Sequence, residues 1–414
     1  MSGVSALTLP DPRVLVLQLG ARLHYAVPAV FAEANALQGL YTDACASLGI
    51  LSVARRRIPT RYRSAGLRRL LGRTLPDEVP PALVRVETLA AIIERLRLPF
   101  VRKEVVISTH ERLRRRILRG RFDGANCLYC VDNGDLDLMK AARDAGLAVL
   151  YEQVICPSVG RILREERRRY PGIELEPGEE VERGIARDIE IFGLVKMVVC
   201  GSDFVRDDVL SLAPAAQASV IPYGINHQWL DIPTQTIPGR ILFVGTVGLR
   251  KGNHYLAEAT RLLKGRGLNC DVRVVGPYDA GVISRPEFQG PTYIGQVPRD
   301  AIRAEFAKAD VFAFPTVAEG SAIVLMEALA CGVPVVTTPN SGSQVRDSRE
   351  GFIVPIRDAG ALADRLEQLI SDRSLRGRFS QQCRQRAEEF SWRRFGQLLL
   401  AATRAALQGV SNDK

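Results

Sequence analysis

Long apolar runs are missing from this sequence. No uninterrupted apolar segment reaches the roughly 18 to 20 residues that a membrane-spanning helix needs. The first 20 residues also lack a basic stretch followed by a long apolar one, which is the pattern of a secretory signal. These two absences argue against a membrane-spanning or exported protein, and we expect the chain to lie in the cytoplasm.

A second pair of closely spaced cysteines is also absent. Eight cysteines are present, but only Cys127 and Cys130 form a CxxC pair, and no second pair or histidine follows at the spacing of a zinc site. Most cysteines lie in apolar runs typical of strands or helices, as expected of reduced, buried thiols that pack like small hydrophobic residues. The pattern therefore disfavours a metal or redox centre.

Acidic residues are scarce in the first 121 residues. That region carries 21 lysines and arginines against nine aspartates and glutamates, a net charge of +12, whereas the whole chain carries +10. Such a field favours an anionic partner such as an acidic membrane surface, although a solvated basic face would look the same. Aromatic residues make up 6% of the chain and are not regularly interleaved with the basic clusters, so we expect no nucleic-acid partner. The basic clusters are Arg55 to Arg57, Arg61, Arg63, Arg68, Arg69, Arg112 and Arg114 to Arg116.

Short apolar runs alternate with helical patterns along the whole chain. Runs such as RVLVLQL (13–19), RILFVGTV (240–247) and DVFAFPT (310–316) are typical of buried strands, and each precedes a helix-like segment. A chain of 414 residues also exceeds what one hydrophobic core usually serves. The pattern predicts an α/β fold with two doubly wound, Rossmann-like domains that face each other across a cleft.

The boundary between the domains is predicted at a segment rich in proline and glycine. Residues 222–239 carry three prolines and two glycines and interrupt the alternation of strands and helices. We therefore place an N-terminal domain at residues 1–224 and a C-terminal domain at residues 225–395. Residues 396–414 predict an amphipathic helix that packs back on the N-terminal domain, or alternatively on the surface of the second domain.

Two glutamates frame the otherwise small and apolar stretch EGSAIVLME (319–327). Glu319 follows the strand-like run DVFAFPT, and Gly320 allows a tight turn and the close approach of a ligand. The amides of residues 321–323 would be unpaired donors in the first turn of a helix, which form an anion site. Glu327 would lie one to two turns further on, within reach of sugar or ribose hydroxyls. The alternative is a helix-start acid and a partly exposed helical residue without function.

Two cations lie in a second loop that the pattern brings to the same place. FVGTVGLRKGNHYL puts Arg250 and Lys251 between a strand and a helix, so their loop should lie at the carboxyl edge of the sheet that carries Glu319. Two cations there can neutralise a diphosphate leaving group as its bond to a sugar breaks. The alternative is a pair of solvated loop cations.

The order of these motifs resembles that of a known family. FVGTVGLRKG, VVGP, YIGQVP and ADVFAFPTVAEGSAIVLMEALACGVPVV are similar to the carboxyl-terminal lobe of family-4 retaining glycosyltransferases, which have an E-x7-E signature and the GT-B fold. The resemblance is dense over residues 195–395 and looser for GARLHYAVPAVF near the N-terminus. Thr246 stands where the family often has arginine, and GSA (320–322) stands where it has Gly-aromatic-Gly.

The resemblance implies a reaction. A hexose-type sugar would pass from a nucleotide-diphosphate sugar to a glycan or lipid-linked acceptor in cell-surface or exopolysaccharide biosynthesis. The anomeric configuration would be retained, and no metal or other cofactor would be required. The basic N-terminal region adds the expectation of peripheral contact with the inner face of an anionic membrane.

The resemblance also implies site residues by position. Glu319 would hold the hydroxyls of the donor sugar, Glu327 would hold the ribose, and His24 or Glu152 would lie near the reacting carbon or the acceptor. His24 has a purely structural alternative. The diphosphate would be bound by Arg250 and Lys251, and the other donor contacts would be Gly20, Gln296, Val297, Gly320, Ser321, Ala322 and Ile323.

Two other functions stay open at this point. One is a non-catalytic nucleotide-sugar-binding partner of a glycan assembly complex. The other is a nucleotide-sugar epimerase or phosphorylase of the same fold, which would need an acid/base pair or a cofactor lysine near the cleft that the sequence does not show. Turnover of the donor in the presence of an acceptor separates the first of these from a glycosyltransferase.

Overall fold

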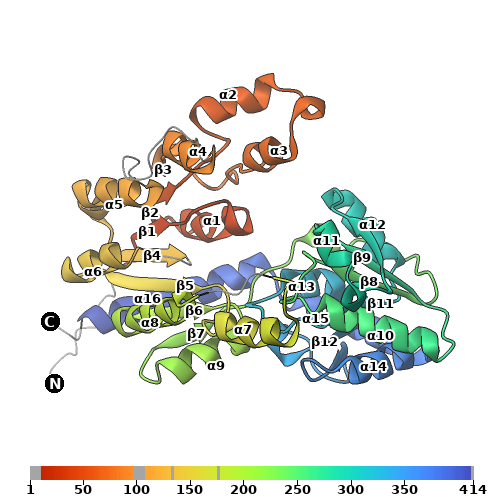
Figure 1. Cartoon of the computed structure of the whole chain (residues 1–414). Helices are drawn as coiled ribbons and strands as arrows, with labels where there is room; N and C mark the ends of the chain where they lie inside the picture. The colour runs from red at the N-terminus through yellow and green to blue at the C-terminus, as the bar shows by residue number, and fades with distance from the viewer. Residues whose placement is uncertain (1–10, 97–107, 132–134, 175–177, 412–414) are drawn as a thin grey trace.

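Two parallel β-sheets organise the protein, as the computed structural model shows for residues 11–96, 108–131, 135–174 and 178–411. Each sheet lies among helices, and the two domains lie side by side in Figure 1. The predicted α/β architecture of two doubly wound domains is confirmed.

The first sheet has seven strands in the order β3-β2-β1-β4-β5-β6-β7, and every pairing is parallel. The order reverses between β1 and β4, and the loops at the carboxyl ends of such strands are where doubly wound sheets bind ligands. The strands are β1 (Val14–Leu17), β2 (Leu37–Thr42), β3 (Val84–Val86), β4 (Cys127–Val131), β5 (Ala148–Gln153), β6 (Met197–Cys200) and β7 (Ala218–Val220).

The second sheet has six strands in the order β10-β9-β8-β11-β12-β13, again all parallel. Its order reverses between β8 and β11, which puts the loops after these two strands next to each other. The strands are β8 (Arg240–Val244), β9 (Asp271–Val275), β10 (Thr292–Gly295), β11 (Val311–Phe314), β12 (Val335–Thr337) and β13 (Gly351–Ile353).

The helices connect the strands and cover the sheets. In the first domain they are α1 (Ala26–Glu33), α2 (Gly49–Arg57), α3 (Ala65–Leu71), α4 (Thr88–Leu96), α5 (Thr109–Arg119), α6 (Leu136–Asp144), α7 (Val159–Arg169), α8 (Glu180–Leu194) and α9 (Asp203–Leu212). In the second they are α10 (Asn253–Gly265), α11 (Ala280–Ile283), α12 (Arg299–Lys308), α13 (Ile323–Ala330), α14 (Ala359–Ser371) and α15 (Arg373–Glu388), and α16 (Trp392–Ser411) ends the described chain.

The strands are short and apolar because they are buried on both faces. Along β1, Val14 and Val16 belong to one hydrophobic core and Leu15 and Leu17 to the core on the opposite face of the sheet. Successive side chains of a strand point to opposite faces, so a parallel sheet covered on both sides needs a continuous apolar run. The same reasoning explains why the CxxC run forms β4, with both of its thiols buried.

The helix α16 returns to the first domain. It packs on α1 and β5, and Figure 1 shows it running back along the first sheet. Phe395 and Leu399 belong to a first-domain core. The helix begins at Trp392, so the boundary that we expected at residue 396 falls inside it.

Two segments of the first-domain chain are placed differently from the rest. Residues 159–174, between β5 and β6, lie against the second domain, where Ile173 is part of the hydrophobic core. The helices α2 and α3 lie at the outer end of the first domain in Figure 1.

No helix in the described ranges is both long and apolar enough to cross a membrane.

Candidate active site at the domain junction

The two loops that the sequence singled out meet at the carboxyl edge of the second sheet. β8 pairs with β11, so the loop with Arg250 and Lys251 lies beside the loop with Glu319. Both cations form ion pairs with the Glu319 carboxylate, and Arg250 also donates a hydrogen bond to the Ala318 carbonyl at 3.1 Å. Glu319 is only 9% exposed. A buried carboxylate paired with two cations therefore lies at the carboxyl edge of the second sheet.

Lys251 is held in a partly dehydrated position. Its Nζ lies 4.9 Å from the centre of the Phe314 ring, over the face of that ring. Burial lowers the pKa of Lys251, as does the neighbouring Arg250 to a smaller extent, while the Glu319 carboxylate opposes the change. A cation that is poorly solvated interacts more strongly with an anionic ligand than one in open water.

The turn at Gly320 is wedged between the two domains. A Cβ on Gly320 would lie 1.7 Å from the Val154 carbonyl oxygen, so no larger residue fits without moving the backbone. The Ser202 hydroxyl donates to the Gly320 carbonyl at 2.6 Å, and the Cys156 amide donates to the Glu319 carbonyl at 3.4 Å. The first domain therefore contacts the turn that carries Glu319 directly.

The helix after this turn begins two residues later than expected. Ala322 is the residue before α13, and Ile323 is its first residue. The Ala322 amide donates to the Ser341 carbonyl at 3.4 Å, so the expectation that this amide is unpaired is wrong, because the loop after β12 supplies an acceptor. Ser321 packs near Gly201 of the first domain, and Ile323 lines the space between the domains.

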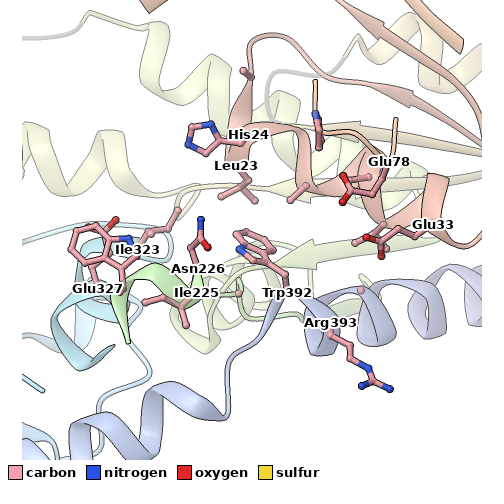
Figure 2. Close-up of a pocket in the computed structure, with 18 of the residues that line it drawn as sticks. Leu23, His24, Glu33, Glu78, Ile225, Asn226, Ile323, Glu327, Trp392 and Arg393 are labelled. Atoms are coloured by element: carbon pink, nitrogen blue, oxygen red, sulfur yellow. The ribbon is translucent and has the colours of Figure 1, made fainter. Parts of the chain in front are cut away.

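Glu327 lies one turn into α13, on the wall of a cavity of about 1150 Å³ between the domains. Burial raises the pKa of this carboxyl to about 7, although Arg299 and Arg303 act in the opposite direction. Arg299 Nη2 lies 3.7 Å from Glu327 Oε1. Figure 2 shows Glu327 and His24 at the same end of this cavity, on opposite walls.

Val297 lines the same cavity as Glu327, whereas Gln296 beside it is exposed and does not line it. Both residues follow β10, the edge strand of the second sheet. Of the two residues predicted to contact the donor, only Val297 is therefore part of the cavity wall, which continues from α13 to the start of α12.

His24 reaches across the domain junction. Its Nε2 lies 2.9 Å from Arg299 Nη1, so His24, Arg299 and Glu327 form a chain from the first domain to the second. Burial, and to a smaller extent the Arg299 charge, lower the pKa of His24. Leu23, His24 and Tyr25 all have left-handed backbone conformations, with φ of 49°, 53° and 61°. Such strain in residues other than glycine is concentrated at functional sites.

The loop after β1 is anchored at Gly20. Gly20 has φ of 74°, and its amide donates to Asp43 Oδ1 at 2.8 Å. Asp43 is held in turn by Arg73 at 2.7 Å. The amide that could approach a phosphate is therefore engaged with a side chain in this structure.

Glu152 lies beneath the cavity walls. It is 1% exposed and accepts hydrogen bonds from the hydroxyls of Tyr129 and Tyr223, each at 2.8 Å, and from Arg22 at 3.2 Å. Arg22, not Glu152, lines the neighbouring cavity of about 510 Å³, together with His110. The structure thus gives Glu152 the position of a support for Arg22.

Residues 238–372 match the family described as "Glycosyl transferases group 1". This match and the curated relatives fit a group 1 glycosyltransferase. The stretch that matches contains Arg250, Lys251, Glu319 and Glu327, the residues that form the second-domain side of the site.

Individual relatives agree with this assignment. The glycosyltransferase is 28% identical over 324 residues to a D-inositol 3-phosphate glycosyltransferase of Arthrobacter sp. (strain FB24), covering 73% of this chain and 75% of the relative. It is 34% identical over 146 residues to the colanic acid biosynthesis glycosyltransferase WcaL of Salmonella typhimurium, covering only 32% of this chain and 36% of the relative. Relatives of the glycosyltransferase therefore include proteins named for polysaccharide biosynthesis.

The fold has counterparts among solved structures. Anabaena HepE, solved in complex with UDP and glucose, superposes with a TM-score of 0.60 at 14% identity, covering 94% of this chain and 98% of HepE. The glycosyltransferase has the GT-B fold.

Two arginines of the site were missed by sequence reasoning. Arg22 lies two residues after Gly20, in a loop whose position at the carboxyl end of β1 was the available signal. Arg299 follows Val297 and lies at the start of α12, where the sequence indicated only a helix start. Both are single arginines in a chain with many, so only the fold distinguishes them.

Proposed function

We propose that this glycosyltransferase transfers a hexose-type sugar from a nucleotide-diphosphate sugar to a glycan or lipid-linked acceptor, with retention at the anomeric carbon and without a metal or other cofactor. The observation that carries the proposal is the buried Glu319 carboxylate between Arg250 and Lys251, in the turn just before α13, the helix whose Glu327 lines the cavity between the domains. The function lies in the biosynthesis of a surface or secreted polysaccharide.

The charges of Arg250, Lys251 and Glu319 indicate how the donor would bind. A diphosphate would share the two cations with Glu319, whose carboxylate would then accept hydrogen bonds from the sugar hydroxyls. Glu327 would accept from the ribose, and Val297 and Gln296 would lie near the base. The amides of Gly320, Ser321 and Ile323 at the start of α13 would face the phosphates.

Catalysis would rest on stabilising the leaving group. Negative charge would grow on the diphosphate as the sugar–oxygen bond breaks, and Arg250 and Lys251, which are both paired with Glu319, would lie where that charge develops. The leaving phosphate can take the proton of the acceptor hydroxyl on the same face of the sugar, so retention needs no pair of carboxylates of the glycosidase kind. Among the described residues no three histidine, cysteine or acidic side chains are grouped as metal ligands. In this proposal Arg250 and Lys251 carry the role that a metal has in other phosphate sites.

His24 is the first-domain residue that we place nearest the sugar or the acceptor, because it faces Glu327 across the cavity. Glu152 would act on the acceptor side indirectly, by holding Arg22 at the wall of the smaller cavity. Arg22 and that cavity suit an acceptor that carries a negative charge.

Turnover of a panel of nucleotide sugars tests the proposal. We expect one donor to release its nucleoside diphosphate in the presence of a cell-envelope lipid or glycan extract, and the anomeric configuration of the product to match that of the donor by NMR. Glu319→Gln should abolish release, whereas Glu258→Gln, at an exposed position of α10, should not. Binding without release would favour the non-catalytic partner, and an epimerised nucleotide sugar without transfer would favour the epimerase.

We also propose peripheral contact with an anionic membrane through α2 and α3. The segment 49–71 carries seven arginines, and three of its large apolar side chains are exposed, namely Ile50, Val53 and Tyr62 at 74%, 55% and 68%. Apolar side chains among arginines suit the boundary between lipid headgroups and acyl chains.

Vesicle co-sedimentation tests this contact. The protein should bind phosphatidylglycerol-containing vesicles at low salt but not pure phosphatidylcholine vesicles. Replacing Arg55, Arg56 and Arg57 by glutamine should reduce binding by on the order of a hundredfold, at about 1 kcal/mol per arginine. Equal binding to both kinds of vesicle, or none to either, would remove the proposal.

A further inference from the structure

The loop that carries Arg250 and Lys251 is supported by the first-domain chain. Glu174 Oε1 accepts a hydrogen bond from the Leu249 amide at 2.9 Å. A Cβ on Gly248 would lie 2.9 Å from the same oxygen, so glycine at this position lets the carboxylate approach the loop. Arg167 of α7 holds Glu174 through an ion pair of 3.2 Å. The residue directly before Arg250 is therefore fixed by a carboxylate that comes from between β5 and β6.

The other end of the loop is held by a second carboxylate of the same segment. Glu166 has no exposed side-chain surface and lies 2.9 Å from His254 Nε2, and it accepts from the Tyr255 hydroxyl at 2.5 Å. Arg357 donates to its other oxygen at 2.7 Å. His254 and Tyr255 form the first turn of α10, three and four residues after Lys251. The two glutamates thus hold the loop from both sides.

Further contacts fix the segment 159–174 on the second domain. Ile173 is part of the hydrophobic core of the second domain. Arg285 donates hydrogen bonds to the carbonyls of Pro171 and Gly172 at 3.3 and 3.1 Å. The ring of Tyr170 packs edge-on against His254, with 4.4 Å between ring centres. Figure 1 shows α7 at the junction of the two domains. This segment, named the brace below, is covalently part of the first domain and packed as part of the second.

The loop needs such support because its own sequence gives it little. Glycines stand at 245, 248 and 252, two of them with φ of 155° and 69°, and glycine has the largest conformational freedom of all residues. Cations stabilise a leaving diphosphate best when they are already in place and do not reorganise during the reaction. The contacts of Glu174 and Glu166 on the two sides of Arg250 and Lys251 hold the loop in one conformation before the ligand binds.

We propose that Glu174 and Glu166 are positioning residues for the diphosphate-binding loop, so that a donor site located in the second domain depends on the brace from the first. The proposal rests on the proposed function for its ligand. It predicts that loss of the brace weakens the binding of the phosphate groups. The contacts of the ribose and base with Glu327 and Val297 should keep their strength.

Glu174 offers a matched set of variants. Glu174→Gln keeps an oxygen that can accept from the Leu249 amide, whereas Glu174→Ala does not. Glu182→Ala serves as the control, because Glu182 of α8 pairs with Arg161 of α7, the helix that also carries Arg167, and the contacts of Glu182 do not include the loop. Two measurements are made on each protein. One is the ratio of the affinities for a nucleoside diphosphate and its parent nucleoside, and the other is hydrogen exchange in the peptide that spans residues 246–252.

We expect Glu174→Ala to lower the diphosphate-to-nucleoside affinity ratio roughly tenfold, the loss that follows from removing a hydrogen bond to a charged group. Exchange in the loop peptide should quicken, while Glu174→Gln and Glu182→Ala stay near the wild type. An unchanged ratio and unchanged exchange in Glu174→Ala would overturn the proposal. So would a parallel loss of affinity for both ligands together with a lower melting temperature, because that result describes general destabilisation.

The two proposals fail differently. If the wild type binds no nucleotide, the proposed function is wrong, and the exchange measurement alone still decides whether the brace orders the loop. If the wild type binds a nucleoside diphosphate and Glu174→Ala leaves loop exchange and affinity unchanged, the proposed function stands. The proposal that the brace positions the loop is then wrong.

Discussion

Donor affinity should depend on pH through Glu327. Burial raises the pKa of this carboxyl from about 4.5 to about 7. A group with that pKa is roughly one-tenth ionised at pH 6 and roughly nine-tenths ionised at pH 8. Only the ionised carboxylate can accept hydrogen bonds on both oxygens from the two ribose hydroxyls, so the donor binds that form. Affinity should therefore rise with pH, roughly tenfold between pH 6 and pH 8, whereas a carboxyl with its ordinary pKa would give no change in this range.

The assay is calorimetric titration with the intact nucleotide sugar at pH 6, 7 and 8. The sugar-capped diphosphate is preferred because a free terminal phosphate itself titrates near pH 6. Titrations at pH 6 in two buffers of different ionisation enthalpy should also show the release of nearly one proton per donor bound. In Glu327→Gln both effects should disappear. His24→Gln should keep the slope, because burial and Arg299 lower the pKa of His24 from 6.5, which leaves it neutral over most of the range.

Two results would refute this reasoning. Affinity that is flat with pH in the wild type would mean that the donor does not distinguish the two protonation states of Glu327. The same slope in Glu327→Gln would mean that another group, such as Lys251 or a phosphate ligand, carries the titration.

Three further outcomes are expected. Gly320→Ala should lower kcat/KM about a hundredfold, because its Cβ would collide with the Val154 carbonyl and shift the turn that carries Glu319; steady-state rates equal to the wild type would contradict this. Leu399→Ala, fully buried in α16, should cost about 2 to 5 kcal/mol in the free energy of unfolding by urea titration. The adjacent Leu398→Ala, where the side chain is 37% exposed, should cost clearly less. A chelator should leave initial rates unchanged, and a loss that magnesium restores would show that the charge is carried by a metal.

Much of the fold could be predicted because its signals are local. Short apolar runs between amphipathic segments indicate parallel strands and their crossover helices, which are the elements of the two sheets. The meeting of Arg250 and Lys251 with Glu319 could also be predicted, because the loops after neighbouring strands of a parallel sheet share one edge.

Contacts between the domains could not be read in the same way. Glu166 and His254 are 88 residues apart, and their pairing depends on how α7 docks on the second domain. The sequence of α7 is rich in arginine and typical of a surface helix. The strained turn at Leu23 to Tyr25 was equally hidden, because residues other than glycine seldom adopt positive φ and their sequence does not mark it. Sequence reasoning thus predicted which loops of the second domain meet and missed the contacts that position them.

The most direct test of the account is the affinity of nucleoside diphosphates for Lys251→Met. Calorimetry with UDP, GDP and ADP should find one that binds the wild type and binds Lys251→Met at least roughly tenfold more weakly, since a contact between ions on the diphosphate is lost. Lys264→Met, at the far end of α10 where the ammonium group bonds to the Gly290 carbonyl, should bind as the wild type does. If no nucleoside diphosphate binds the wild type, or if Lys251→Met binds it equally well, the cations around Glu319 are not a donor site and the central claim is wrong.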